Sequence, residues 1–482
     1  MFASIAIEIQ APGMYTVPLC DSESVQFWTP FEEKVLMAQP TTSSLLISPK
    51  LRLLVGLLVC LAVPVSASTQ STLSLSDAVK QALDNHEDSE IALLRLKQAE
   101  ARERQVLARL FPQLSASASV IYLPATTSEV ADLGTVDSES KTITSGSADL
   151  TIDLVNLSAL ADYLAAPDRT QAQNFATQET RRQLAFAVAR QFLMVLATEQ
   201  VKVAAGNRLE VAGLTVTQAE QRFKAGVGRA SDVTRAELEK ASAESTRISS
   251  NRDVTLEGLN LTQLLVLPNT SKDGPKLQAP GKSLIDFDWK NEELANQALE
   301  GRLDLRQAKL IVDTSSMAIR QNLAGYLPSI SAGATVSKRN DGVVDRDVQW
   351  TVGLNMRWSL YSGGYRMAED DRLEAEVQTA RLLVSKLTRV ISHEVEVAKR
   401  RLEASLAEVQ QATVQAALAD KNGQQTAAMF EHGLATALER VDAIANTFSA
   451  QSNLVGRQLE VRLAELALLQ AMGRWPAGDE AP

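Results

Sequence analysis

The sequence has very little cysteine and histidine and no common catalytic motif. Its 482 residues contain only two cysteines, Cys20 and Cys60, so a disulfide framework is excluded. The three histidines, His86, His393 and His432, lie far apart in the sequence and have no metal-ligand spacing around them. No nucleophile-elbow serine motif, phosphate-binding loop or zinc-protease helix motif is present. We therefore expect no catalytic residue, no metal and no cofactor, and no enzyme.

Basic residues are outnumbered by acidic ones, 48 to 58, which gives a net charge of −10. Proteins that bind nucleic acids usually present an excess of positive charge to the phosphates. This balance therefore argues against a nucleic-acid partner.

Proline is missing from two long stretches, between Pro167 and Pro268 and between Pro328 and Pro476. A proline inside a helix costs roughly 3 kcal/mol, so its absence permits very long helices. Apolar residues in both stretches recur at helical spacing between charged residues and alanines. The pattern predicts long amphipathic helices with narrow apolar seams, suited to coiled-coil packing.

The chain divides into two similar halves, each with the order helix, proline, strand pair, very long helix, glycine turn, helix. Pro112 corresponds to Pro328, and Gly226 corresponds to Gly433. We expect a first repeat at 68–268, a connector at 269–290, a second repeat at 291–476 and a tail at 477–482. The helices are expected at 75–110, 158–223 and 231–267, then at 292–324, 363–430 and 438–472. The two longest would each extend about 100 Å at 1.5 Å per residue.

Four segments alternate apolar and small polar residues, at about 112–124, 143–155, 328–338 and 348–360. Each is near the roughly 9–11 residues with which a tilted strand crosses a bilayer. A soluble sheet with one wet face would show the same alternation, so both interpretations stay open here. Four strands are too few to close a wide barrel, whereas three chains would supply twelve.

Residues 50–67 have the pattern of a secretory signal peptide: Lys50 and Arg52, an apolar run, then small residues ending at Ala67. Residues 1–49 would precede that signal as an upstream extension, and we expect the true start to lie within it, for example at Met37, so that residues 1–36 are not translated. No later run of eighteen apolar residues occurs, so we expect no transmembrane helix downstream.

These features together resemble the TolC family of outer-membrane efflux proteins. The resemblance covers about residues 73–476 and depends on the duplicated order and on several short motifs. These are P-x-[LI]-S-A at the start of each strand pair, RFKAGVGRASDV, WSLYSGG, and MFEHGLATALERVDAIA. The first half departs from the pattern where NLSA (156–159) replaces YSGG (361–364).

The resemblance implies an α+β membrane protein with duplicated helical coiled-coil hairpins and four strands per chain. It implies a homotrimer whose 12-stranded β-barrel lies in outer-membrane lipid and continues into a periplasmic α-helical tunnel. The implied function is a passive exit duct for efflux or type I secretion. Its implied partners are a periplasmic adaptor and an inner-membrane transporter. The alternative is a periplasmic coiled-coil scaffold or adaptor without a barrel.

The resemblance also implies a periplasmic constriction near the second glycine turn. Its ring of acidic residues falls on Glu439 and Asp442. The family tyrosine that ties this region to its neighbour falls on Phe430, and the partner of that tyrosine falls on Asp232. Phe430 has no hydroxyl, and a basic family residue of the same link falls on Ala435, so this link is missing here. Acidic residues at this place could equally serve to stabilise a helix N-terminus.

The glycine turns themselves are the implied adaptor-contact tips. Gly226 and Val227 form the first, and Gly433 and Leu434 form the second. Ordinary helix termination at glycine would produce the same residues, and the two interpretations are compatible.

Overall fold

The computed structural model describes residues 72–476, apart from 131–133, 268–275, 282 and 342–346. The chain divides into two units, 1–68 and 69–482, and every described residue lies in the second unit. The predicted upstream extension, signal peptide and C-terminal tail lie outside the described residues.

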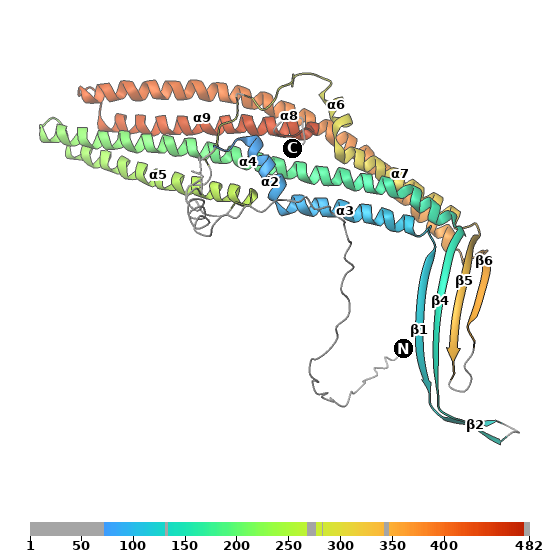
Figure 1. The fold of residues 1–482 in the computed structure, drawn as a ribbon. Coiled ribbons are helices and arrows are strands. Elements are labelled where there is room, and N and C mark those ends of the chain that lie inside the picture. Colours follow the sequence, from blue (N-terminus) through green and yellow to red (C-terminus); the bar gives the residue numbers. More distant parts are fainter. Residues whose placement is uncertain (1–71, 131–133, 268–275, 282, 342–346, 477–482) are drawn as a thin grey trace, which may run out of the picture. The chain divides into compact units, whose positions relative to one another are not determined.

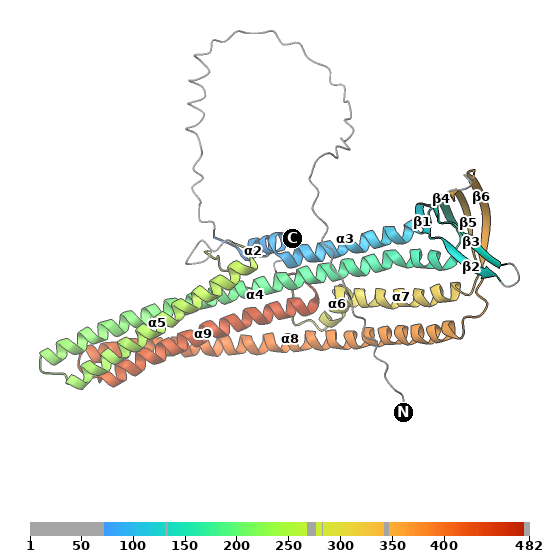
Figure 2. The same cartoon turned by 90° about the horizontal axis from the view of Figure 1, so that it is seen from below.

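Four long helices form two helical hairpins that lie side by side (Figures 1 and 2). In the first hairpin, α4 (Leu157–Lys224) turns into α5 (Ala230–Leu264). In the second, α8 (Tyr365–Glu431) turns into α9 (Ala437–Met472). The helix α4 has 68 residues and α8 has 67, so each extends about 100 Å at 1.5 Å per residue. The proline-poor stretches form long helices, as the sequence predicts, and α4 also begins ten residues before Pro167, so it contains that proline in its first part.

The shorter helices differ from the prediction, because each is broken once. In place of one helix at 75–110, α2 (Leu75–Asn85) and α3 (Glu87–Ala108) are separated by His86. Its backbone is extended, and its ring Nδ1 accepts a hydrogen bond from the Asp88 amide at 3.1 Å, which caps α3. In place of one helix at 292–324, α6 (Leu294–Gly301) and α7 (Leu303–Ala324) are separated by extended Arg302. The two breaks hold equivalent places in the two halves.

Two buried arginines hold the C-terminal end of α9 between the halves. Arg182 of α4 donates from Nη1 to the Gln470 carbonyl at 3.0 Å. Arg302 donates from Nη1 to the Ala471 carbonyl at 3.4 Å. Carbonyls in the last turn of a helix lack intrahelical donors, so these contacts satisfy them and favour the helix dipole. Both guanidinium groups also form ion pairs, with Glu179 for the first and with Asp304 and Glu394 for the second.

The main sheet is antiparallel, with the strand order β1-β4-β5-β6. Its strands are β1 (Gln113–Leu123), β4 (Lys141–Val155), β5 (Ser329–Asn340) and β6 (Gln349–Arg357). The prediction of four strands missed a second, two-stranded sheet, β2 (Thr126–Val130) with β3 (Gly134–Ser138). These two short strands pair only with each other, and their polar sequence lacks the alternation by which the other four were found.

In the middle of the strands, the register of the main sheet places apolar side chains on one face and polar side chains on the other. One row across the sheet joins Leu114, Leu150, Ala334 and Val352. A row on the opposite face joins Ser117, Ser147, Ser337 and Gln349. Nothing in the described part of the chain covers the apolar face, where Leu114, Trp350 and Leu354 are each about three-quarters exposed. A soluble antiparallel sheet buries its apolar face against a core, and residues 72–476, as far as they are described, provide no such core for this face.

Most of the core lies between the helices. One buried cluster joins α2, α4, α5 and α9 around Phe186, Phe192 and Leu261. A second joins α6, α7, α8 and α9 around Leu305 and Ile391. Among the described residues, α4 is the one helix with an 18-residue window apolar enough to cross a membrane, with mean hydropathy 1.3. That window is 44% buried inside the protein, and core helices meet the same criterion, so it is weak evidence for a span.

Candidate functional site

The two hairpin turns, at the helix ends away from the sheet, share one backbone design (Figure 1). Gly226 and Gly433 have φ of 75° and 79°, the left-handed conformation that only glycine adopts readily. The amides of Val227 and Leu434 then bond back to carbonyls in the last helical turn, at 3.1 and 2.8 Å. Both α4 and α8 therefore end in a Schellman motif, which requires the glycine.

Each turn exposes a large apolar residue directly after its glycine. Val227 is 70% exposed and Leu434 is 75% exposed. A hydrophobic residue at this position of a Schellman motif commonly packs back on its own helix, and neither of these is buried. The four residues predicted as tips are thus at the turns, with their apolar side chains available for contact.

Phe430 is buried at the second turn and contacts the first hairpin. It is 3% exposed and packs in a small cluster with five other apolar side chains, Val216, Ala219, Ala236, Ala435 and Ala437. The guanidinium of Arg222, in the last turn of α4, lies 4.9 Å from the centre of the Phe430 ring. Arg222 Nη1 also donates to the Phe430 carbonyl. This Arg222–Phe430 contact joins the first hairpin to the second through a cation–π interaction and a hydrogen bond.

The resemblance places the partner of the family tyrosine at Asp232, and the missing hydroxyl of Phe430 removes that link; in the structure Asp232 bonds at the start of its own helix. Its carboxylate accepts a hydrogen bond from the Arg229 amide at 3.2 Å, at the start of α5. The role of Arg222 was missed, because a basic residue in the last turn of a helix is usually explained by the helix dipole alone. The available signal was its position next to Phe223, the residue equivalent to Phe430.

Glu439 forms a capping box at the start of α9. Its carboxylate accepts from the Thr436 amide at 2.7 Å and from the Thr436 hydroxyl at 3.0 Å, and its own amide donates to that hydroxyl. These hydrogen bonds lower the pKa of Glu439 below its ordinary value of 4.5. Glu439 and Asp442 are both exposed, one helical turn apart. In a single chain, the helix N-terminus alone accounts for Glu439.

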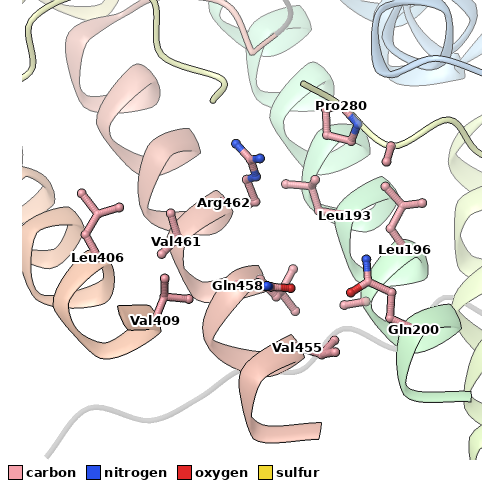
Figure 3. A pocket seen from close by; sticks show the side chains of 13 residues that line it. Leu193, Leu196, Gln200, Pro280, Leu406, Val409, Val455, Gln458, Val461 and Arg462 are labelled. Atoms are coloured by element: carbon pink, nitrogen blue, oxygen red, sulfur yellow. The ribbon is translucent and has the colours of Figure 1, made fainter. Parts of the chain in front are cut away.

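A cavity of about 440 Å³ lies nearer the connector, between α4, α8 and α9 (Figure 3). Its walls are mainly aliphatic, with Leu193 and Leu196 from α4 and Leu406 and Val409 from α8. Arg462 at its edge is already paired with Glu465 at 2.9 Å and donates to the Gly281 carbonyl at 2.8 Å. No group of three or more His, Cys, Asp or Glu side chains within the described residues could hold a metal ion.

Two tandem helical hairpins, each joined to half of a sheet with an uncovered apolar face, define a duplicated channel-type membrane protein. The chain belongs to the outer membrane efflux protein family, whose model matches residues 78–265 and 294–474. The two matched segments lie in the two halves described above. The resemblance inferred from the motifs is thus confirmed, and the chain is an outer-membrane efflux channel protein.

Curated relatives agree with this assignment. The outer membrane protein TolC of Vibrio cholerae is 22% identical over 317 residues, 61% of this chain and 68% of the relative. The probable efflux pump outer membrane protein TtgC of Pseudomonas putida is 24% identical over 430 residues, 83% of each chain. The alternative of a periplasmic scaffold or adaptor is disfavoured.

Solved structures share the fold at low identity. CusC has a TM-score of 0.71 and 17% identity, covering 84% of this chain and 92% of its own. The outer membrane protein VceC of Vibrio cholerae has a TM-score of 0.68 and 18% identity, covering 83% and 96%.

Proposed function

We propose that three copies of the chain form a passive exit duct, in which their sheets join into a 12-stranded barrel in outer-membrane lipid. The observation that carries this proposal is the uncovered apolar face of the main sheet, on which Trp350 and Leu354 are three-quarters exposed. Lipid would cover that face, and the serine-rich face would line the channel.

The two edges of the sheet support the same assembly. The outer strands β1 and β6 have no further strand partner within the described part of the chain. Natural edge strands are usually protected by charges, prolines or bulges. The eleven residues of β1 contain no charged residue and no proline, and the nine of β6 contain one charge, Arg357. Pairing of β1 with β6 of a neighbouring copy would remove every edge.

At the other end, Glu439 and Asp442 would form the constriction. Threefold symmetry would place six carboxylates around one opening, and acidic rings favour cations and repel anions. The Arg222–Phe430 contact would hold the second hairpin against the first, in place of the hydroxyl link that Phe430 cannot make. Asp232 instead accepts a hydrogen bond from the Arg229 amide at the start of α5.

The tips Gly226, Val227, Gly433 and Leu434 would contact a periplasmic adaptor through the two exposed apolar side chains. An inner-membrane transporter would supply the energy for efflux or type I secretion, since the chain has no motif for nucleotide hydrolysis. Two relatives from Pseudomonas putida are an antibiotic efflux pump outer membrane protein, ArpC, and a toluene efflux pump outer membrane protein, TtgC. Those substrates belong to the relatives.

Membrane fractionation and bilayer recordings test this proposal. The chain should sediment with the outer membrane, migrate as a heat-sensitive trimer from mild detergent, and conduct ions in planar bilayers. A chain recovered only as a periplasmic monomer without conductance would contradict the proposal. Detergent extraction at matched concentrations controls for aggregation.

A further inference from the structure

A second cavity lies closer to the tips than the one in Figure 3, and it has a different chemical character. Its volume is about 300 Å³, near the lower limit of small-molecule sites. Its walls come from three helices, α4, α8 and α9. The apolar part includes Val211, Ile444 and Phe448, and the polar part includes Asn207, Gln451 and Arg440.

Arg440 is the unusual residue of this cavity. It is only 9% exposed, and its side chain makes one hydrogen bond within the described residues, from Nη1 to the Gly423 carbonyl at 2.9 Å. Its Nε is buried without a partner. Burial lowers the pKa of Arg440, and no acidic group offsets that effect. A buried cation without a counter-ion is costly, by several kcal/mol in typical proteins.

Two other arginines with little exposure show what Arg440 lacks. Arg182 is paired with Glu179 at 2.8 Å, and Arg208, which lines the same cavity, is paired with Glu239 at 2.9 Å. The one carboxylate on the cavity wall, Asp420, is exposed and accepts a hydrogen bond from Gln424 at 2.8 Å. The cavity therefore contains an unpaired guanidinium beside apolar walls.

We propose that this cavity binds a carboxylate attached to a small apolar group, with Arg440 as its counter-ion. A guanidinium recognises the planar carboxylate through charge-assisted hydrogen bonds, and Phe448, Ile444 and Val211 contact the apolar part. The carboxylate comes either from a free organic acid or from an acidic side chain of a second copy of the chain. The site lies on the buried face of α9, so it is distinct from exposed Glu439 and Asp442.

The test uses the full-length, detergent-solubilised protein with benzoate as the probe and benzamide as its neutral isostere. Ligand-observed NMR should show saturable benzoate binding, with benzamide about tenfold weaker because the charge-assisted hydrogen bond is lost. Arg440→Gln should abolish the difference. Arg457→Gln is the matched control, because Arg457 is also on α9 and is paired with Glu408 and Glu460 outside this cavity.

Thermal melting shows whether the carboxylate comes from a free organic acid or from an acidic side chain of a second copy. If a second copy already supplies the carboxylate, benzoate will not bind, Arg440→Gln will lower the Tm, and Arg440→Lys, which keeps the charge, will restore it. The proposal is overturned if benzoate and benzamide bind equally. It is also overturned if benzoate does not bind and Arg440→Gln melts at the same or a higher temperature, as expected for removal of an unpaired buried charge.

Discussion

The two hairpin tips have the same backbone and different surroundings. Both end a long helix at a left-handed glycine, expose an apolar residue next, and begin the following helix with an acid at its third position, Asp232 or Glu439. The equivalent phenylalanines differ sharply, since Phe223 is 49% exposed and Phe430 is 3% exposed. The two turns thus have the same backbone conformation, whereas only the phenylalanine of the second turn is buried, where it contacts Arg222 of the first hairpin.

The helix caps show the same asymmetry. Thr436 caps α9 with its hydroxyl, whereas Arg229 at the equivalent place in front of α5 has no side-chain hydrogen bond of the usual capping kind. The second tip is therefore both better capped and better buried. This difference fits a role in which the second hairpin forms the constriction and the first supports it.

The largest expected effect comes from removing the acids of the second tip. Replacing Glu439 and Asp442 with alanine should raise single-channel conductance and reduce the cation-to-anion permeability ratio by roughly an order of magnitude. Planar-bilayer recordings measure both quantities. Asp232→Ala, the equivalent change at the first tip, is the control and should leave selectivity nearly intact. Equal effects at the two tips, or no change in either variant, would refute the assignment of the constriction.

Breaking the Arg222–Phe430 contact should have the next largest effect. Arg222→Ala removes a hydrogen bond from a charged donor and a cation–π contact, so the second tip should lose about 1.5–3 kcal/mol of local stability. Hydrogen exchange of the amides of Gly433 and Leu434 reports that loss. Lys224→Ala is the matched control, because Lys224 is 77% exposed in the same helical turn. Similar exchange in both variants would mean that the contact does not hold the tip.

A smaller effect is expected from the helix caps. Thr436→Ala should destabilise the start of α9 by about 1 kcal/mol, because the hydroxyl that satisfies the Glu439 amide is lost. Arg229→Ala should change the start of α5 by much less. Amide exchange in the first turn of each helix compares them. If the two substitutions prove equally costly, the asymmetry of the tips does not come from their caps.

The smallest effect concerns pH. The lowered pKa of Glu439 means that its carboxylate is still charged at and somewhat below pH 4.5, its ordinary value. Its capping contribution is therefore present above that value and is lost as the pH falls through the lower, folded-state pKa. Cation selectivity measured from pH 7 to pH 3 should persist at pH 5 and decline only below about pH 4.5. Thr436→Ala should move the decline to higher pH, and an unchanged midpoint would count against the capping box as the cause.

Much of the fold could be predicted from the sequence because its signals are local. The long proline-free stretches indicated the long helices, although α4 also contains Pro167 near its start. The left-handed turns required Gly226 and Gly433, and alternation marked the four long strands. The breaks at His86 and Arg302 could not be predicted, since neither is a helix breaker. Arg302 is fixed by ion pairs with Asp304 and distant Glu394. Tertiary contacts of this kind override local helix propensity.

The candidate site was predictable only in part, for a related reason. Gly226, Val227, Gly433 and Leu434 lie at the turns because helix termination is local. The partner of Phe430 is Arg222, 208 positions earlier in the chain, and no local pattern specifies that pairing. The acidic ring depends on neighbouring copies, so Glu439 and Asp442 stay a prediction.

Cysteine crosslinking tests most directly whether the outer strands of the sheet, β1 and β6, pair between copies. Within one chain β1 and β6 are separated by two strands, so they lie about 14 Å apart, beyond the roughly 7 Å that a disulfide can bridge. In a chain with Cys20→Ser and Cys60→Ser, Ala118→Cys in β1 is combined in turn with cysteine at Thr351, Val352 or Gly353 in β6. Oxidation should yield covalent dimers and trimers at one register, and only monomers at every register would contradict the barrel.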